Sequence, residues 1–258
     1  MLLELKDINL AFNPGSPDEM ELFSGFSFAV PEGQFASVVG SNGSGKTSLL
    51  NLVCGTMAPD SGRVFFEGKD ITALSAIKRA SWIGRVFQDP KAGTCAHLTI
   101  MENLALADNK GGAYNLGRGV NKSRAEHYRA LLAQCGMGLE NRLDAQVGTL
   151  SGGQRQALAL VIACMSDIRL LILDEHTAAL DPKSSETIME LTDQFVRERK
   201  LTSVMVTHNL RYAVSYGDRL LMMHQGRFIV DKADEEKRAL AVDDLLGVFN
   251  GISIEAGN

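Results

Sequence analysis

The order of apolar and polar residues predicts strands that alternate with helices. Short apolar segments bounded by turn residues cover residues 2–39, and residues 35–39 are apolar enough to form a strand buried on both faces. Residues Lys46–Cys54 follow a helical period and stop at Gly55, a residue type suited to the end of a helix. The pattern therefore predicts a β-rich N-terminal part, then a buried strand, a glycine-rich loop and a helix.

A helical insertion is predicted between residues 90 and 165, because strand patterns disappear there and two capping boxes occur. Residues 109–121 contain four glycines and few apolar residues, which predicts a mobile surface loop. The two capping boxes are Thr99 with Glu102 and Ser123 with Glu126.

Strands and helices alternate again in the last third of the chain. An apolar strand at residues 170–173 precedes a helix opened by Asp181 as its cap and Pro182 at its first position. A short amphipathic helix is expected at residues 243–249. This alternation is typical of an α/β layered domain. Two further strands are predicted, at Thr202–Val206 and at residues 219–223.

Composition narrows the class of protein. With 258 residues, 45% hydrophobic and 22% charged, the chain is globular, and its net charge of −5 argues against nucleic acid as the main partner. The N-terminus lacks the pattern of a signal peptide, and the longest apolar run, residues 157–165, is about half of a membrane span. Any membrane role is therefore expected through a partner. The cysteines are too far apart to indicate a zinc site or a disulfide framework, at positions 54, 95, 135 and 164.

The segment GSNGSGKT matches the phosphate-binding pattern GxxxxGK[ST], and it lies between a predicted strand and a predicted helix. Its glycines let backbone N–H groups turn inward, and the helix points its positive dipole end at the same place. Lys46 is then expected to neutralise the β- and γ-phosphates of ATP, and the Thr47 hydroxyl to ligate Mg²⁺. The residues predicted to bind the nucleotide here are Gly40, Ser41, Asn42, Gly43, Ser44, Gly45, Lys46, Thr47 and Ser48.

The segment LLILDE supplies the carboxylates that such a loop requires. Asp174 follows a buried strand and is the predicted magnesium ligand. Glu175 is expected to orient or activate the attacking water. Taken alone, two acids at a strand end are usually solvated, and the phosphate loop upstream changes that interpretation.

The segment LSGGQ, with Ser151, Gly152, Gly153 and Gln154, indicates a second anion-binding helix terminus. Ser151 would cap a helix that begins near Gln154, and one ATP cannot easily use both termini of one subunit. With this segment, the chain resembles the nucleotide-binding subunits of ATP-binding-cassette (ABC) transporters from about residue 2 to residue 249.

The resemblance implies one domain, residues 1–258, with a P-loop NTPase (RecA-like) core, an antiparallel β subdomain and a helical insertion that carries LSGGQ. The expected parts are residues 1–89 and 166–232 for the core with its β subdomain, 90–165 for the helical part and 233–258 for a C-terminal helix and tail.

The resemblance also implies an ATP-dependent head-to-tail homodimer, in which the signature of one copy closes over the γ-phosphate held by the other. Gln88 would link magnesium and water to the transmembrane partner, Asp181 would communicate across the dimer, and His208 would contact the γ-phosphate. Phe12 stands where an aromatic residue stacks on adenine. His176 follows Glu175 where proline is more usual, and is interpreted as a loop residue.

The chain carries one set of motifs and no membrane helix, which favours a separate ATPase subunit that works with transmembrane permease subunits. The expected setting is the cytoplasmic face of a bacterial membrane, in an importer of amino-acid-like solutes that also uses an extracytoplasmic substrate-binding protein. Two alternatives stay open: a soluble accessory ATPase similar to that of iron–sulfur cluster assembly, and a nucleotide-gated docking protein with little turnover.

Overall fold

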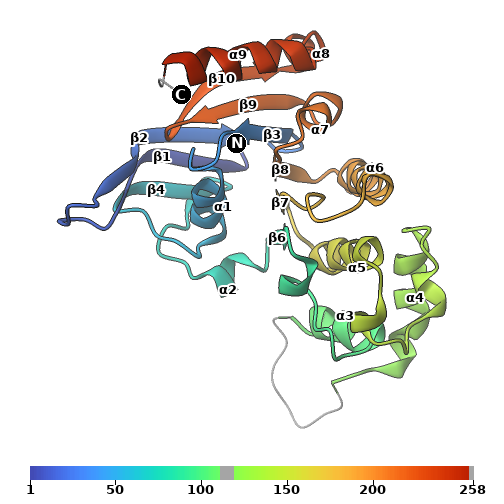
Figure 1. The fold of residues 1–258 in the computed structure, drawn as a ribbon. Helices are drawn as coiled ribbons and strands as arrows, with labels where there is room; N and C mark the ends of the chain where they lie inside the picture. Colours follow the sequence, from blue (N-terminus) through green and yellow to red (C-terminus); the bar gives the residue numbers. More distant parts are fainter. Residues whose placement is uncertain (111–118, 256–258) are drawn as a thin grey trace. The chain divides into compact units, whose positions relative to one another are not determined.

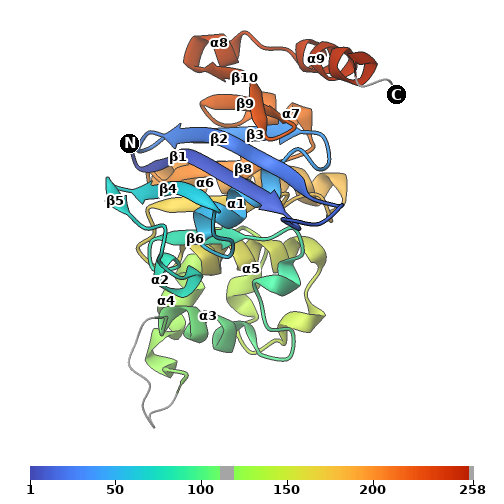
Figure 2. The same ribbon diagram turned by 90° about the vertical axis from the view of Figure 1, so that its left-hand side faces the viewer.

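The computed structural model describes residues 1–110 and 119–255, and it divides into two compact units. The first comprises Met1–Ala73 and Thr202–Asn258, and the second comprises Leu74–Leu201 (Figures 1 and 2). The predicted loop at residues 109–121 falls mainly on residues outside the described ones. The predicted α/β class is confirmed, and the predicted boundaries of the helical part stay a prediction.

One sheet of the first unit is antiparallel, with the strand order β2-β1-β4-β5. Its strands are β1 (Leu3–Phe12), β2 (Met20–Val30), β4 (Ser61–Phe66) and β5 (Lys69–Asp70). Strand β1 lies between β2 and β4, and its apolar residues are buried at Leu3, Leu5 and Ile8. The predicted β-rich N-terminal part is confirmed.

The other strands of the first unit are mainly parallel, and one of them, β3 (Phe35–Gly40), leads directly into the phosphate-loop segment. Strand β3 runs parallel to β8 (Thr202–Val206) on one side and to β9 (Arg219–His224) on the other. Every residue of β3 and of β8 is buried, as expected for strands covered on both faces. Strand β10 (Arg227–Ala233) pairs with β9 through the turn at residues 225–226.

Helix α1 (Lys46–Cys54) has the predicted bounds and ends at Gly55, whose φ of 74° is the left-handed conformation that glycine adopts at little cost. Three further helices complete the first unit: α7 (Leu210–Ser215), α8 (Asp234–Arg238) and α9 (Val242–Glu255).

Helix α9 is longer than the predicted residues 243–249. Gly251, which follows the predicted end, lowers the helix propensity of this segment, so its sequence favours a shorter helix. Packing compensates, because Leu245 is buried in an apolar cluster against which Val248 and Phe249 also pack. The other buried members of the cluster are Val39, Ala213, Leu220 and Met222.

The second unit contains a parallel strand pair and most of the helices. Strands β6 (Ile83–Val86) and β7 (Leu170–Asp174) pair from Ile83 with Leu170 to Val86 with Leu173. The helices are α2 (Ala76–Arg79), α3 (Ile100–Asp108), α4 (Ala125–Ala133), α5 (Gly152–Cys164) and α6 (Pro182–Glu198). In both units, no described helix is long and apolar enough to cross a membrane.

One of the two predicted capping boxes is confirmed. Thr99 accepts a hydrogen bond from the backbone of Glu102, and the Glu102 side chain accepts one from the backbone of Thr99. The box at Ser123 is wrong: a 3₁₀ turn, Lys122–Arg124, precedes α4, which has no side-chain cap. The side-chain oxygen of Asn121 instead accepts a hydrogen bond from the backbone N–H of Ser123, because asparagine stabilises a local turn of this kind.

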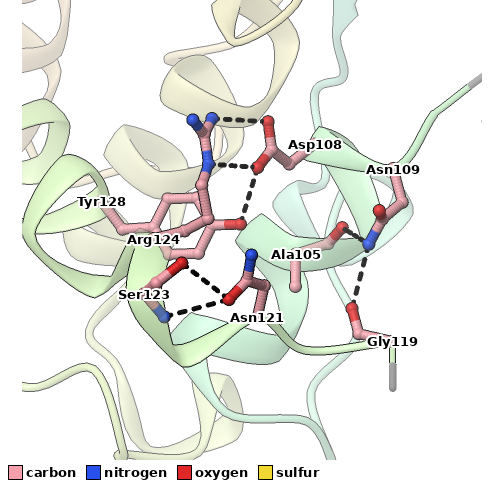
Figure 3. A network of polar contacts seen from close by, with 8 residues as sticks. All are labelled: Ala105, Asp108, Asn109, Gly119, Asn121, Ser123, Arg124 and Tyr128. Carbon is pink, nitrogen blue, oxygen red and sulfur yellow. Dashed lines mark hydrogen bonds and ion pairs between the residues drawn. The ribbon is translucent and has the colours of Figure 1, made fainter. Parts of the chain in front are cut away.

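A polar network joins the end of α3 to the start of α4 (Figure 3). Arg124 donates two hydrogen bonds of 2.8 Å to the two carboxylate oxygens of Asp108, and the Tyr128 hydroxyl donates a third of 2.9 Å. Burial raises the pKa of Asp108, but the bonds from Arg124 and Tyr128 outweigh it and hold that pKa below its ordinary value. The two helices are thus tied together by a charged carboxylate.

Candidate functional site

The phosphate-loop segment connects β3 to α1 in the first unit, as predicted. A Cβ at Gly40 would lie 2.2 Å from the carbonyl oxygen of Met223 on β9, so only glycine fits at the end of β3. Gly45 is the N-cap of α1 and has a φ of 110°, with no side-chain cap at this helix end. Gly45 thus offers no side-chain cap to the start of α1, and a helix N-terminus of this kind suits a phosphate.

Lys46 lies across this loop. Its side chain is 5% exposed, and its ammonium donates hydrogen bonds of 2.8 Å to the carbonyl oxygens of Gly40 and Ser41. The Ser44 hydroxyl is buried, and among the described residues it has no hydrogen-bond partner. A bound phosphate oxygen would satisfy such an orphaned group, so the loop fits an oxyanion.

The other predicted residues near the start of α1 are accessible. Thr47 is exposed on the first turn of α1, Ser48 is half-buried, and Asn42 is exposed in the loop. An exposed hydroxyl on this turn is available to a metal ion. The metal-binding role of Thr47 stays a prediction.

His208 follows β8 at the same end of the sheet as the phosphate loop. The backbone N–H of Thr207 donates to the carbonyl oxygen of Val38, which places the end of β8 beside the end of β3. His208 is exposed there, next to Asn209, which caps α7. The structure thus brings His208 and the phosphate loop to one sheet edge. Phe12 ends β1 in the other sheet, and its adenine-stacking role stays a prediction.

The second unit holds the predicted carboxylates. Asp174 is the last residue of β7, and Glu175 follows with a φ of 47°, an uncommon backbone conformation for this residue type. Because β6 and β7 are parallel and in register to their ends, exposed Gln88 leaves the sheet at the edge where Asp174 lies. Three predicted site residues therefore share one strand edge.

Arg85 was missed by sequence reasoning. Its Nη2 atom donates a 2.7 Å hydrogen bond to Oδ2 of Asp174, and both side chains are only 14% exposed. An arginine in the otherwise apolar run IGRVF, three residues before Gln88, was the available indication. The predicted magnesium ligand is thus held by a cation of the neighbouring strand.

His176 lies in the turn between β7 and α6, as predicted for a loop residue, and it is buried there. Its side chain is 2% exposed, and its Nε2 atom lies 3.1 Å from the hydroxyl oxygen of Thr192 on α6. That hydroxyl donates to the carbonyl oxygen of Ile188, so Nε2 must be the donor to Thr192. Burial lowers the pKa of His176 to about 4, and the ring is neutral at physiological pH. The residue after Glu175 is therefore anchored to α6.

The LSGGQ segment forms the start of α5. Ser151 accepts from the backbone of Gln154, and the Gln154 side chain accepts from the backbone of Ser151. The helix begins at Gly152 rather than near Gln154, because this capping box includes both glycines in the first turn. The predicted second helix terminus with a serine cap is present.

The signature segment packs against the start of α6. A Cβ at Gly153 would lie 3.1 Å from the side chain of Ser184, whose backbone N–H donates to Asp181. The hydrogen bonds from Ser184 hold the pKa of the exposed Asp181 carboxyl below its ordinary value. Asp181 caps α6 as predicted, and the close approach of Leu180 and Ser184 to the two glycines explains the small residues in LSGGQ.

Comparison with known proteins places the chain among ATPases. The family model described as ABC transporter matches residues 23–178. A tyrosine transport ATP-binding protein of Clostridioides difficile is 43% identical over 250 residues, covering 96% of this chain and 98% of the relative. The thiamine import ATP-binding protein ThiQ of Salmonella typhimurium is 34% identical over 202 residues, covering 78% and 81% of the two chains.

Solved structures agree with these relatives. The ADP conformation of an ATP-binding cassette of an ABC transporter has a TM-score of 0.80 at 26% identity, covering 100% of this chain and 99% of its own. A dimeric ATP-binding cassette in a post-hydrolysis state with ADP and phosphate has a TM-score of 0.75 at 26% identity, covering 90% and 98%. The phosphate loop, the strand-edge carboxylates and the signature helix are thus parts of one known architecture.

Proposed function

The chain belongs to the ABC transporter family and is an ATPase, and we propose that it powers an importer of amino-acid-like solutes, aromatic amino acids among them. The observation that carries this proposal is the 43% identity, over almost the whole length of both chains, to a tyrosine transport ATP-binding protein. A cassette without a membrane-spanning helix among its described residues depends on transmembrane partners for transport. We place it on the cytoplasmic face of the membrane, with an extracytoplasmic substrate-binding protein as a further partner.

ATP would be held first by the phosphate loop. Lys46 would move its ammonium from the carbonyl oxygens of Gly40 and Ser41 to the β- and γ-phosphates, and Ser44 would donate its orphaned hydroxyl. Phe12 would offer its ring to adenine. These contacts bind the nucleotide and fix the γ-phosphate in place.

The donor set fits magnesium. Thr47 offers a hydroxyl and Asp174 a carboxylate, and oxygen ligands of this kind suit Mg²⁺, with the Gln88 amide oxygen as a third. Bound Mg²⁺ supplies charge neutralisation at the β- and γ-phosphates. Each of the three would serve as one of its ligands, as the family resemblance implies.

Glu175 is the proposed general base. Its carboxylate would take the proton of the attacking water as the water oxygen bonds to the γ-phosphorus, and the bond to the β-phosphate oxygen breaks to leave ADP and phosphate. His208 would donate a hydrogen bond to the γ-phosphate. The position of His176 fixes the segment that carries Glu175.

The second helix terminus explains the dimer. A solved cassette of this fold is dimeric, and Ser151 at the start of α5 caps a helix terminus that suits an anion. We propose that this terminus closes over the γ-phosphate bound to the partner copy. Ser151→Arg should leave folding and ATP binding of the monomer intact and abolish ATP-dependent dimers in analytical ultracentrifugation. Normal dimerisation of that variant would contradict the shared site.

Uptake in cells tests the importer proposal. Cells that carry Glu175→Gln in place of the wild-type chain should lose accumulation of labelled tyrosine, phenylalanine or tryptophan, while thiamine uptake stays unchanged as the control. The wild-type chain should also purify from detergent-solubilised membranes with transmembrane proteins. Purification with soluble scaffold proteins alone would favour the accessory ATPase, and absence of ATP turnover in every complex would favour the docking protein.

A further inference from the structure

The proposed hydrolysis mechanism gives no role to the ion pair between Arg85 and Asp174. It joins adjacent parallel strands at their edge, with Nη2 of Arg85 2.7 Å from Oδ2 of Asp174. Both side chains are only 14% exposed, so solvent screens this pair far less than a surface pair. A guanidinium thus neutralises the carboxylate that is proposed to hold magnesium.

Arg85 is fixed in this position by its neighbours. It lies within β6, whose backbone pairs with β7, and its guanidinium carbon stands 4.8 Å from the ring centroid of Phe87. The Phe87 carbonyl oxygen in turn accepts a hydrogen bond of 3.2 Å from Gln156 on α5. The strand pairing and the Phe87 ring therefore both limit where the guanidinium can lie, and the bond from Gln156 fixes the backbone that carries this ring.

Two cations at one carboxylate oppose each other. Asp174 would bring bound magnesium close to the fixed positive charge of Arg85, and like charges repel strongly where solvent screens them little. When no metal is bound, the same guanidinium lowers the free-energy cost of keeping the Asp174 carboxylate charged and partly buried. The pair therefore stabilises the metal-free site at the expense of metal affinity.

We propose that Arg85 is a positioning residue that holds Asp174 in the metal-free state and sets the concentration of Mg²⁺ at which nucleotide binding becomes complete. This inference rests on the proposed function, since it assumes that Asp174 is a metal ligand. With Arg85 in place, Asp174 would bind magnesium weakly in the absence of nucleotide. It would bind magnesium more readily when the negative charge of the triphosphate accompanies the ion.

The test measures nucleotide binding against free Mg²⁺. A fluorescent, non-hydrolysable ATP analogue is titrated onto the full chain at buffered free Mg²⁺ concentrations, and the half-saturating Mg²⁺ concentration is compared between variants. Arg85→Gln removes the charge and should lower this concentration by about tenfold or more. Arg85→Lys keeps a charge and should stay close to the wild type.

The matched control is Arg129→Gln, which removes an arginine from an exposed ion pair with Glu126 in the same unit. It should leave the Mg²⁺ titration unchanged. Arg85→Met keeps an unbranched chain over the Phe87 ring and gives a second uncharged variant if Arg85→Gln fails to fold. It too should shift the titration.

The possible outcomes separate the two proposals. Nucleotide binding with an unchanged Mg²⁺ requirement in the uncharged Arg85 variants overturns the inference and leaves the proposed function standing. A titration of Asp174→Asn identical to that of the wild type contradicts the metal role of Asp174, which is the part of the proposed function on which this inference rests. A shift in the uncharged variants but not in Arg85→Lys or Arg129→Gln supports the role of Arg85.

Discussion

The phosphate loop in the first unit and the strand edge of β6 and β7 in the second unit reach their geometry in different ways. The loop makes its characteristic contacts locally: Gly45 caps α1, and Lys46 bonds to carbonyl oxygens five and six residues back. At the strand edge, the important partners are distant in sequence. Asp174 is held by Arg85, 89 residues away.

Whether the contacts of a site are local or distant in the chain determines how well the site can be predicted from the sequence. Where a short segment determines its own backbone conformation, its sequence alone is enough to predict its binding chemistry. The segment GSNGSGKT therefore predicts an oxyanion site directly. A carboxylate at a strand end has no such local signature, because its charge state and orientation depend on which side chain the fold places beside it. The two regions should therefore respond differently to substitution.

The largest expected effect lies at the strand edge. Glu175→Gln should lower the ATP turnover rate by about 1,000-fold, because the amide cannot take a proton from water, while nucleotide affinity stays near the wild type. Steady-state phosphate release and equilibrium nucleotide binding measure the two quantities. Glu190→Gln, at an exposed position of α6, is the control. A turnover loss below about tenfold would remove Glu175 from the role of base.

Lys46→Ala should weaken ATP binding by about 100-fold, because it removes a buried cation that can donate charge-assisted hydrogen bonds to the phosphates. Isothermal titration calorimetry at fixed ionic strength measures this change. Lys69→Ala, at an exposed position of β5, should leave the affinity unchanged. Equal affinities of wild type and Lys46→Ala would contradict the phosphate site and erase the contrast between the two regions.

Sequence reasoning predicted most of the first unit and the caps of α5 and α6, since strands buried on both faces, turns and serine or aspartate caps are encoded locally. It misplaced the start of α4, where Asn121 competes with Ser123, and the length of α9, where packing overrides Gly251. It could not find Arg85 or the burial of His176. Both depend on pairings between segments that only the fold brings together.

His176 makes stability depend on pH in a defined window. Its pKa is about 4 in the folded chain, against an ordinary value of 6.5, so the unfolded chain binds the proton first as pH falls. The stability contributed by the neutral ring is complete above pH 6.5 and is lost progressively toward pH 4. Between pH 7 and pH 5 the loss should be about 2 kcal/mol.

Urea unfolding at both pH values checks this prediction. His176→Gln keeps an N–H donor for Thr192 and removes the titration, so its free energy of unfolding should fall less than that of the wild type over the same range. His127→Gln, at an exposed position of α4, is the control and should behave like the wild type. The same pH dependence in His176→Gln and wild type would mean that the buried ring does not govern it.

The smallest effect is expected at the polar network between α3 and α4, which also pairs distant residues but leaves them more exposed. Tyr128→Phe removes the hydroxyl that donates to Asp108 and keeps the buried ring, so the free energy of unfolding should fall by about 1 kcal/mol. Asp108 keeps both bonds from Arg124, which limits the loss. Thermal and urea unfolding measure it.

Arg129→Gln, which breaks the exposed pair with Glu126 on α4, provides the comparison and should cost less than about 0.5 kcal/mol. If Tyr128→Phe cost no more than this control, a buried bond between distant residues would contribute no more stability than an exposed bond between near ones. If Tyr128→Phe lowered the free energy of unfolding by about 2 kcal/mol, as expected for protonation of His176, the network would be a main stabilising contact between α3 and α4.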